Sequence, residues 1–447
     1  MSMVVQHNMQ AANANRMLGV TTSAQSKSTE KLSSGYKINR AADDAAGLTI
    51  SEKMRKQIRG LDKASSNAQD GVSSVQTAEG ALTEVHSMLQ RMNELAVQAS
   101  NGTNSKDTDR KAIQDEIDQL NTEIDRVAET TKFNEIYLLK GDDGEKTINL
   151  NAHDAGLKGT LVDNGSGKAT FTMKELSVGD SVSIGGKNYT IGSTAADAQK
   201  IVTGQEKAGG KVTVNGVEYT YNDTDKKWKD AAGADVQIGT GAAAGKIVIG
   251  DGDKVSDGTT TLTAMTDKKD ATGAAKADGV DDNDNSVISA EKAYSLAKDE
   301  LVAANHIGDT ENTAAVAQDT TNKNVFTITT GSAKVANTLS FSLHVGADAD
   351  MTNKITVDID TMNSANLGIK GLNVTDKNGT AATYAIDAIS DAISKVSSQR
   401  SALGAVQNRL EHTIDNLDNI SENTSSAESR IRDTDMAKEM VNYSKNN

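Results

Sequence analysis

The sequence predicts a mainly α-helical protein with a β-rich insertion, in which the N- and C-terminal segments form one discontinuous bundle of long coiled-coil helices. Three observations predict this fold class. Apolar residues recur every three or four positions near both ends of the chain, this period is largely lost between residues 140 and 380, and proline is absent from all 447 residues. Long unkinked helices are therefore allowed at both ends, and the residues between them form a variable outer domain.

The first 32 residues carry a weak heptad repeat in which small side chains predominate, as at Ala11, Ala14 and Leu18. Such a stripe buries too little apolar surface to fold alone, although it allows very close packing against neighbours. We expect this segment to order only on assembly and to stay largely disordered while no second helix covers it.

Two stronger helical segments follow, and the polar stretch 101–107 separates them. Their apolar side chains repeat at spacings of three, four or seven residues, which places them on one face of each helix. These positions are Val75, Leu82, Val85, Leu89, Met92 and Leu95 in the first segment, and Ile113, Ile117, Leu120, Ile124 and Val127 in the second.

A longer stripe occupies the C-terminal region, from Ile386 to Ile431, and holds the period over about six heptads. Burial of this stripe does not by itself offset the entropy lost in ordering so long a helix, so the stripe needs a facing surface. The other strong stripes lie near the N-terminus. We therefore expect the two ends to pack as one antiparallel or parallel bundle, with Leu403 and Leu410 facing Leu89 or its neighbours.

The middle of the chain has the signals of β structure. Val212–Tyr221 alternates apolar and polar residues around Asn215-Gly216, which predicts a two-residue hairpin, and Val182–Ile191 repeats the pattern around Gly185-Gly186. Further strands are expected at 246–249, 324–329, 339–345 and 354–359, with one helix near 289–305. The insertion is thus largely β.

The composition of the chain argues against several classes of function. The formal charge of −15 argues against nucleic acid or an anionic membrane as a partner, since both require clustered lysine and arginine. Cysteine is absent, so neither disulfides nor thiolate metal sites are available. The N-terminus has no secretory-signal pattern, and no stretch of about 18 apolar residues occurs.

Two short motifs resemble ligand-binding loops but lack essential residues. Gly165–Lys168 resembles a phosphate loop, yet Val162 replaces its first glycine and Ala169 the serine or threonine that would hold magnesium. Asp281–Asn285 spaces oxygen atoms like a calcium loop, but Ser286 and Lys292 replace the required glycine and glutamate. No catalytic, cofactor or metal site is therefore expected, although an enzyme or adhesin carried in residues 176–336 stays open as an alternative.

Both helical ends resemble bacterial flagellins. At the N-terminal end the resemblance rests on Leu32–Leu48, Ile50–Arg55, Gln57–Leu61, Gln76–Leu82, Gln90–Ala99, Glu123–Arg126 and Lys132–Asn134, and at the C-terminal end on Leu403–Leu410 and Ser429–Ala437. Gly35 and Gly47 permit turns in the loop between the first two helices, and Asp43 or Asp44 can cap the next helix. Ala45 stands where family members often have proline, which weakens the pre-organisation of that helix.

The resemblance implies five stretches. They are an assembly helix and loop at 1–43, the N-terminal part of the bundle at 44–175, the outer domain at 176–336, the C-terminal part of the bundle at 337–431, and the start of a C-terminal assembly segment at 432–447.

The implied function is that of a structural subunit that self-assembles into the flagellar filament for motility. The protein would be secreted and extracellular, as part of the bacterial flagellum. Its implied partners are other copies of itself, an export chaperone, and cap and hook-associated proteins. A hook–filament junction protein is the alternative within this class. Family members usually continue past a segment like Asn442–Asn446, so we also expect a missing C-terminal helix and a monomer that does not polymerise unaided.

A second implied role is binding to Toll-like receptor five. The residues that match the receptor-facing segment of the family are Gln90, Arg91, Glu94, Leu95, Gln98, Ile113 and Glu116. Their charged and amide groups offer directional hydrogen bonds, and Leu95 a small apolar contact. The alternative interpretation is that Leu95 and Ile113 belong to the packing seam of the bundle and that the other side chains solvate it.

Overall fold

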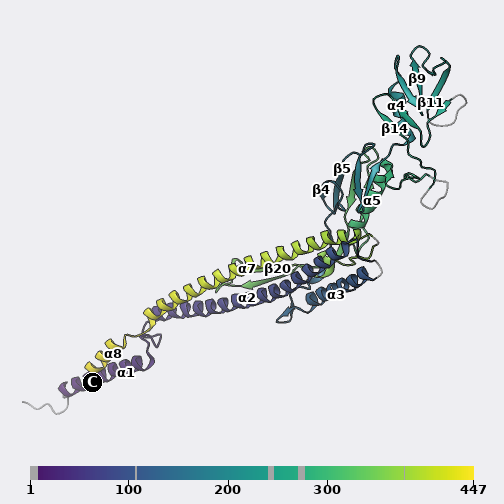
Figure 1. Cartoon of the computed structure of the whole chain (residues 1–447). Helices are drawn as coiled ribbons and strands as arrows, with labels where there is room; N and C mark the ends of the chain where they lie inside the picture. The colour runs from purple at the N-terminus through teal and green to yellow at the C-terminus, as the bar shows by residue number, and fades with distance from the viewer. Residues whose placement is uncertain (1–8, 106–107, 240–245, 270–276, 377, 447) are drawn as a thin grey trace, which may run out of the picture.

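The computed structural model describes residues 9–105, 108–239, 246–269, 277–376 and 378–446. The molecule is elongated, and two long helices, α2 (Ala45–Ser100) and α7 (Thr380–Arg432), run side by side to form a rod (Figure 1). The shorter helices α1 (Met9–Ser34) and α8 (Met436–Asn446) lie beyond one end of the rod, and the β-rich insertion lies beyond the other. The predicted fold class is confirmed.

The two rod helices are antiparallel. Near one end the Ser65 hydroxyl donates to Asp418 at 2.9 Å, and farther along Arg400 pairs with Glu79 at 3.5 Å. The shorter helix α3 (Asp109–Thr130) follows the predicted break and packs against α2. Residues 106–107 of that break lie outside the described residues.

The apolar stripes meet inside the rod, but not entirely as predicted. Leu403 shares the main core with Leu89, whereas Leu410 packs in a separate cluster with Leu61 and other residues nearer the α1–α8 end. The antiparallel arrangement explains this difference. It places Leu410 opposite Gly71, where an added Cβ atom would lie 3.3 Å from the leucine Cδ1.

A β-hairpin lies along the rod and covers the groove between its helices. Its strands, β19 (Leu339–His344) and β20 (Lys354–Ile359), are antiparallel, and the helical turn η1 (Met351–Asn353) lies between them. Gly71 allows the hairpin to approach α2, because a Cβ atom there would lie 2.2 Å from Leu343 Cδ1. Smaller elements complete this region: β1 (Lys132–Phe133) with β2 (Ile136–Tyr137), β3 (Asp142–Asn149) with β18 (Ser332–Asn337), and α6 (Ser364–Leu367).

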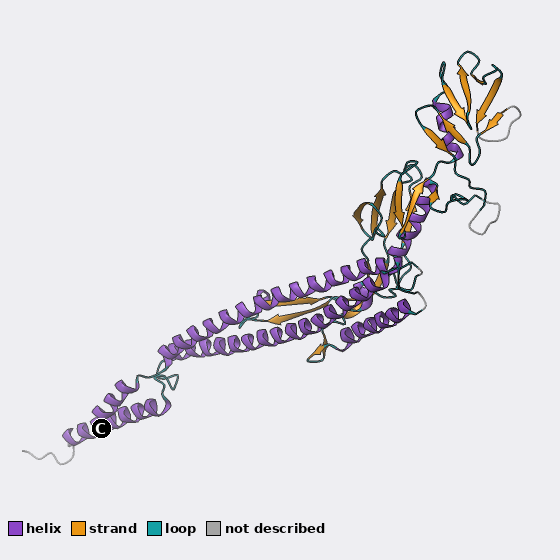
Figure 2. Cartoon of the chain, in the orientation of Figure 1, coloured by secondary structure: helices purple, strands orange, loops and turns teal. Residues whose placement is uncertain are grey.

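The part of the insertion next to the rod contains two sheets and a helix, α5 (Ala290–Asn305) (Figure 2). Phe171 and Phe326 pack at its centre with ring centroids 6.5 Å apart. One sheet has the order β16 (Ala315–Gln318), β17 (Val325–Thr329), β5 (Lys168–Met173), β4 (Gly159–Gly165). The other has the order β15 (Val287–Ile288), β7 (Lys187–Ile191), β6 (Ser181–Ile184).

The outermost part is a seven-stranded sheet with one helix, α4 (Ala195–Gly204). Its central hairpin turns at Asn215 (φ 48°) and Gly216 (φ 86°), which is the backbone of the predicted two-residue turn. The sheet order is β12 (Lys246–Val248), β11 (Asp235–Gly239), β10 (Lys227–Lys229), β9 (Val217–Asn222), β8 (Lys211–Val214), β13 (Lys254–Ser256), β14 (Thr261–Thr263).

The terminal segment differs from its prediction. Residues 9–34 form the helix α1, whereas disorder was expected, and residues 1–8 of the prediction lie outside the described residues. The cause is that α8 lies against α1 and gives it a partner helix. The buried Ser28 hydroxyl of α1 donates to Glu439 of α8, and this hydrogen bond lowers the pKa of that carboxyl.

Candidate assembly and receptor-facing surfaces

The end of the rod is joined to α1 and α8 by two short connectors that are bound to each other. Lys37 N donates to Arg432 O at 2.6 Å, and Thr434 N donates to Gly35 O at 3.0 Å. The Arg432 guanidinium also lies 4.7 Å from the centre of the Tyr36 ring. The connectors therefore form a narrow two-stranded joint.

The start of α2 is fixed by the predicted capping residues. Asp44 is the N-cap and accepts a hydrogen bond from Gly47 N at 2.9 Å. Asp43 accepts from the backbone N–H groups of Arg40 and Asn39, and these bonds lower the pKa of its carboxyl.

The two glycines of this loop have different roles. Gly35 has a φ of 76°, as expected for a turn. Gly47 does not make a turn but lies in the first turn of α2, where a Cβ atom would be 2.5 Å from Asp44 Oδ2 and 2.8 Å from Ile38 Cδ1. Glycine is therefore needed there because the loop packs against the helix.

The α1–α8 pair exposes a series of large apolar side chains. Met9 is 76% exposed and Leu18 is 68% exposed on α1, and Val441 is 67% exposed on α8. Exposed Met17, Val20, Met436 and Met440 extend this surface. Several exposed apolar side chains on one helix pair are typical of an interaction surface.

The seven residues of the expected receptor segment are divided between surface and core. Gln90, Arg91, Glu94 and Gln98 are exposed on α2, and Glu116 of α3 is half-buried beside them. Arg91 Nε donates to Glu116 Oε1 at 2.9 Å and Arg91 also pairs with Glu94 at 3.2 Å. The bond to Glu116, followed by that to Glu94, raises the pKa of Arg91.

Leu95 and Ile113 lie in the main core, with exposures of 2% and 6%. The apolar contact expected of Leu95 is therefore not available at the surface of this structure. Their spacing follows the helical period that places apolar side chains on the buried face.

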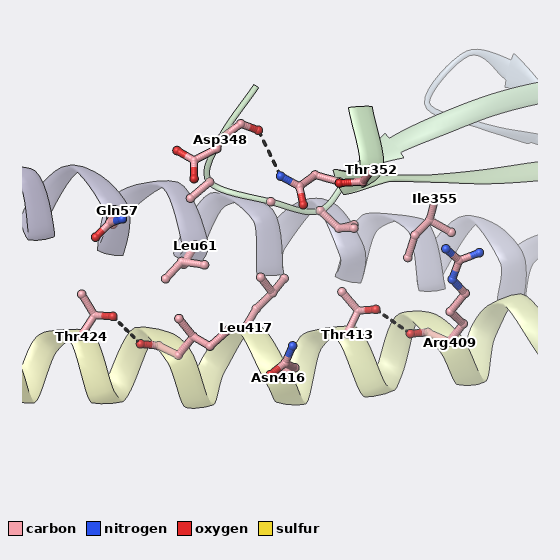
Figure 3. A pocket seen from close by; sticks show the side chains of 15 residues that line it. Gln57, Leu61, Asp348, Thr352, Ile355, Arg409, Thr413, Asn416, Leu417 and Thr424 are labelled. Carbon is pink, nitrogen blue, oxygen red and sulfur yellow. Dashed lines mark hydrogen bonds between the residues drawn. The ribbon is translucent and has the colours of Figure 1, made fainter. Parts of the chain in front are cut away.

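A groove opens where the turn of the β19–β20 hairpin crosses the rod (Figure 3). Leu61 of α2 and Leu417 of α7 lie within it, and Asp348 and Thr352 come from the hairpin turn. The hydrogen bonds drawn there are local, such as Thr413 Oγ1 to the carbonyl oxygen of Arg409 at 2.8 Å. The groove is thus a feature of helix packing that assembles no group of reactive side chains.

The two motifs that resemble ligand loops have structural roles. Gly165–Lys168 connects β4 to β5 as a turn, whereas a phosphate loop leads into a helix. In the calcium-like segment, Asp281 accepts from the backbone N–H of Thr266 at 2.8 Å and of Asn283 at 2.8 Å. Within the described ranges, no three metal-ligating side chains gather and no helix is long and apolar enough to cross a bilayer.

A rod of two distant chain segments, an exposed apolar helix pair at one end and a β insertion at the other define a structural protein built to pack against neighbouring molecules. The description "Bacterial flagellin N-terminal helical region" matches residues 5–143, and "Bacterial flagellin C-terminal helical region" matches residues 386–447. The chain belongs to the flagellin family. It is a structural subunit of the bacterial flagellar filament and not an enzyme.

Full-length relatives support this assignment. A flagellin of Clostridium tyrobutyricum is 37% identical over 449 residues, which cover 100% of this chain and 95% of the relative. Flagellin C of Vibrio cholerae is 36% identical, with 100% and 93% covered. These names favour a flagellin over the junction-protein alternative. A solved structure of FliC from Burkholderia pseudomallei covers 76% of this chain and 99% of its own, at 19% identity and a TM-score of 0.29.

Proposed function

We propose that this flagellin self-assembles outside the cell through the apolar surface of α1 and α8, and that the insertion faces solvent. The observation that carries the proposal is the exposure of Leu18 and Val441 at the end of the rod remote from the insertion. Contacts between different surfaces of successive copies do not close and generate a helical polymer. Export to that location would involve a chaperone, and the filament would contact cap and hook-associated proteins.

Paired substitutions at this surface separate assembly from folding. Leu18→Ser with Val441→Ser should leave the melting temperature nearly unchanged, because both side chains are already exposed in the monomer. The same variant should lose seeded elongation, measured by light scattering and electron microscopy. Asn15→Ser, at an exposed polar position of α1, is the control. Elongation of the double variant at the wild-type rate would contradict the proposal.

We also propose that the exposed residues of the α2–α3 segment bind Toll-like receptor five. The support is a contiguous polar surface in which Arg91 bridges Glu94 and Glu116. Arginine is enriched among the interface residues that contribute most of the binding free energy. Arg91→Ala should weaken receptor activation about tenfold in a reporter-cell assay, while Ser87→Ala on the same helix should not. Equal potency of both variants would rule out this role for Arg91.

A further inference from the structure

Two stripes of opposite charge run along the rod near the end that carries α1 and α8. The basic stripe consists of Lys53, Lys56, Arg59 and Lys63 on α2, all of them exposed. Their spacings of three and four residues place neighbouring members on the same side of the helix. In the part of the chain that the structure describes, none of these four cations forms an ion pair.

The acidic stripe consists of Glu411, Asp415, Asp418 and Glu422 on α7, which are also exposed and spaced by three or four residues. Its hydrogen bonds come from neutral side chains. Gln407 donates to Glu411 at 2.9 Å, and Ser65 donates to Asp418 at 2.9 Å. Over the described ranges, no cation lies within ion-pairing distance of these carboxylates.

The two stripes lie over the same length of the rod without meeting. The hydrogen bonds of Asp418 with Ser65 and of Asp62 with Ser421 place the two segments alongside each other. Buried Leu61 and Leu417 fill the seam between the helices. Asp418 lies at the edge of the seam, where it accepts from Ser65, and the other members of both stripes are exposed outside it. Each stripe therefore presents its charge to the outside.

We infer that the basic stripe of one copy docks against the acidic stripe of a neighbouring copy. This inference rests on the proposed self-assembly and assigns it a second, lateral contact. The stripes match in length, at about 15 Å for the basic and about 17 Å for the acidic one, from a rise of about 1.5 Å per residue. When a contact joins two different surfaces, each added copy still exposes one free surface, so the same contact can form again along a polymer. Charge pairing would set the register of the contact, since electrostatic complementarity mainly governs specificity.

Charge reversal tests this contact. Lys56→Glu with Lys63→Glu should raise the critical concentration for seeded elongation at least about tenfold, because like charges would then face each other. Lys158→Glu with Lys207→Glu changes the net charge equally at exposed positions outside the two stripes and should elongate like the wild type. Adding Asp415→Lys and Glu422→Lys to the first variant should restore elongation. Circular dichroism of each monomer checks that the exposed substitutions leave the fold intact.

Cross-linking gives a second measurement, because the chain contains no cysteine of its own. A mixture of Lys63→Cys and Asp415→Cys chains should form mixed disulfide dimers on oxidation in excess over either homodimer. If the wild type elongates and the Lys56→Glu, Lys63→Glu variant does so equally well, the lateral contact is wrong while self-assembly stands. Failure of the wild type to elongate on any seed would contradict self-assembly itself, and the lateral contact with it.

Discussion

Arg110 shows how a single residue can hold three segments together. It is 1% exposed, although arginine is rarely buried. Its guanidinium donates to the carbonyl oxygens of Ala99 at 2.8 Å, Asn101 at 3.1 Å and Asp376 at 3.0 Å. It thus closes the C-terminal end of α2 and ties the start of α3 to the segment before α7. The sequence could not predict this role, because an arginine after a polar break is usually solvated.

Replacement of Arg110 by alanine should lower the free energy of unfolding by about 3 kcal/mol, because carbonyl groups would lose their donor inside the protein. Lys111→Ala is the neighbouring control. Its exposed ion pair with Asp115 is worth no more than about 0.5 kcal/mol. Urea unfolding followed by circular dichroism measures both. Equal midpoints for the two variants would show that Arg110 is not a structural tie.

Asp235 provides a prediction about pH. Hydrogen bonds from Lys227 and then Lys229 lower the pKa of its carboxyl to about 2. Because the pKa is lower in the folded state, this stabilisation is present above the unfolded pKa of about 3.9 and is lost as the pH falls toward about 2. Lys227→Ala with Lys229→Ala should raise the pKa toward its ordinary value. An NMR titration of the Asp235 carboxyl measures the change, and an unaltered pKa would contradict it.

At the scale of elements, local patterns were the most informative. The heptad stripes predicted the break between α2 and α3, and Asn215-Gly216 predicted a hairpin whose pairing depends only on adjacent residues. The pairing of β5 with β17 was not predictable, because strands so distant in sequence carry no mark of their partner. The sequence also left open whether Leu95 is buried, because the helical period alone does not separate an exposed contact residue from one in the packing seam. The structure places Leu95 in the core.

The α2–α7 seam makes a prediction at this scale. Leu410→Ala should destabilise the protein by about 2 to 5 kcal/mol, because Leu410 is fully buried and its removal leaves a cavity. Ile420→Ala on the same helix is the matched control, since Ile420 is 43% exposed. Thermal unfolding followed at 222 nm compares the two. A melting temperature for Leu410→Ala as high as that of the control would be incompatible with the seam described above.

At the scale of the whole molecule, the outermost unit, which contains the seven-stranded sheet, begins and ends at neighbouring points where it joins the rest of the insertion. Ser193 and Ala264 form a β-bridge, and Met265 N donates to Ser193 O at 2.8 Å. The sequence predicted a variable outer domain at 176–336, and that boundary stays a prediction. Strand β5 lies before this stretch while its partner β17 lies inside it, so cutting there would separate paired strands.

Replacement of residues 194–263 by a short Gly-Ser linker should therefore leave the remaining protein folded, since adjacent ends make loop closure inexpensive in entropy. The expected result is an unchanged melting temperature for the rod helices, measured by circular dichroism. Replacement of 176–336, which removes β17, is the comparison and should expose Phe171 to solvent. Loss of rod helicity in the smaller deletion would show that the outermost unit supports the rod.

The two-stranded joint between the rod and the α1–α8 pair has a mechanical consequence. Rotating the helix pair about the long axis would pull Lys37 from Arg432 and Thr434 from Gly35 together, so the paired connectors resist torsion. Bending of the two-stranded joint requires only small changes in backbone angles, which are spread over both connectors. The paired connectors therefore restrain twisting of the α1–α8 pair relative to the rod more than bending.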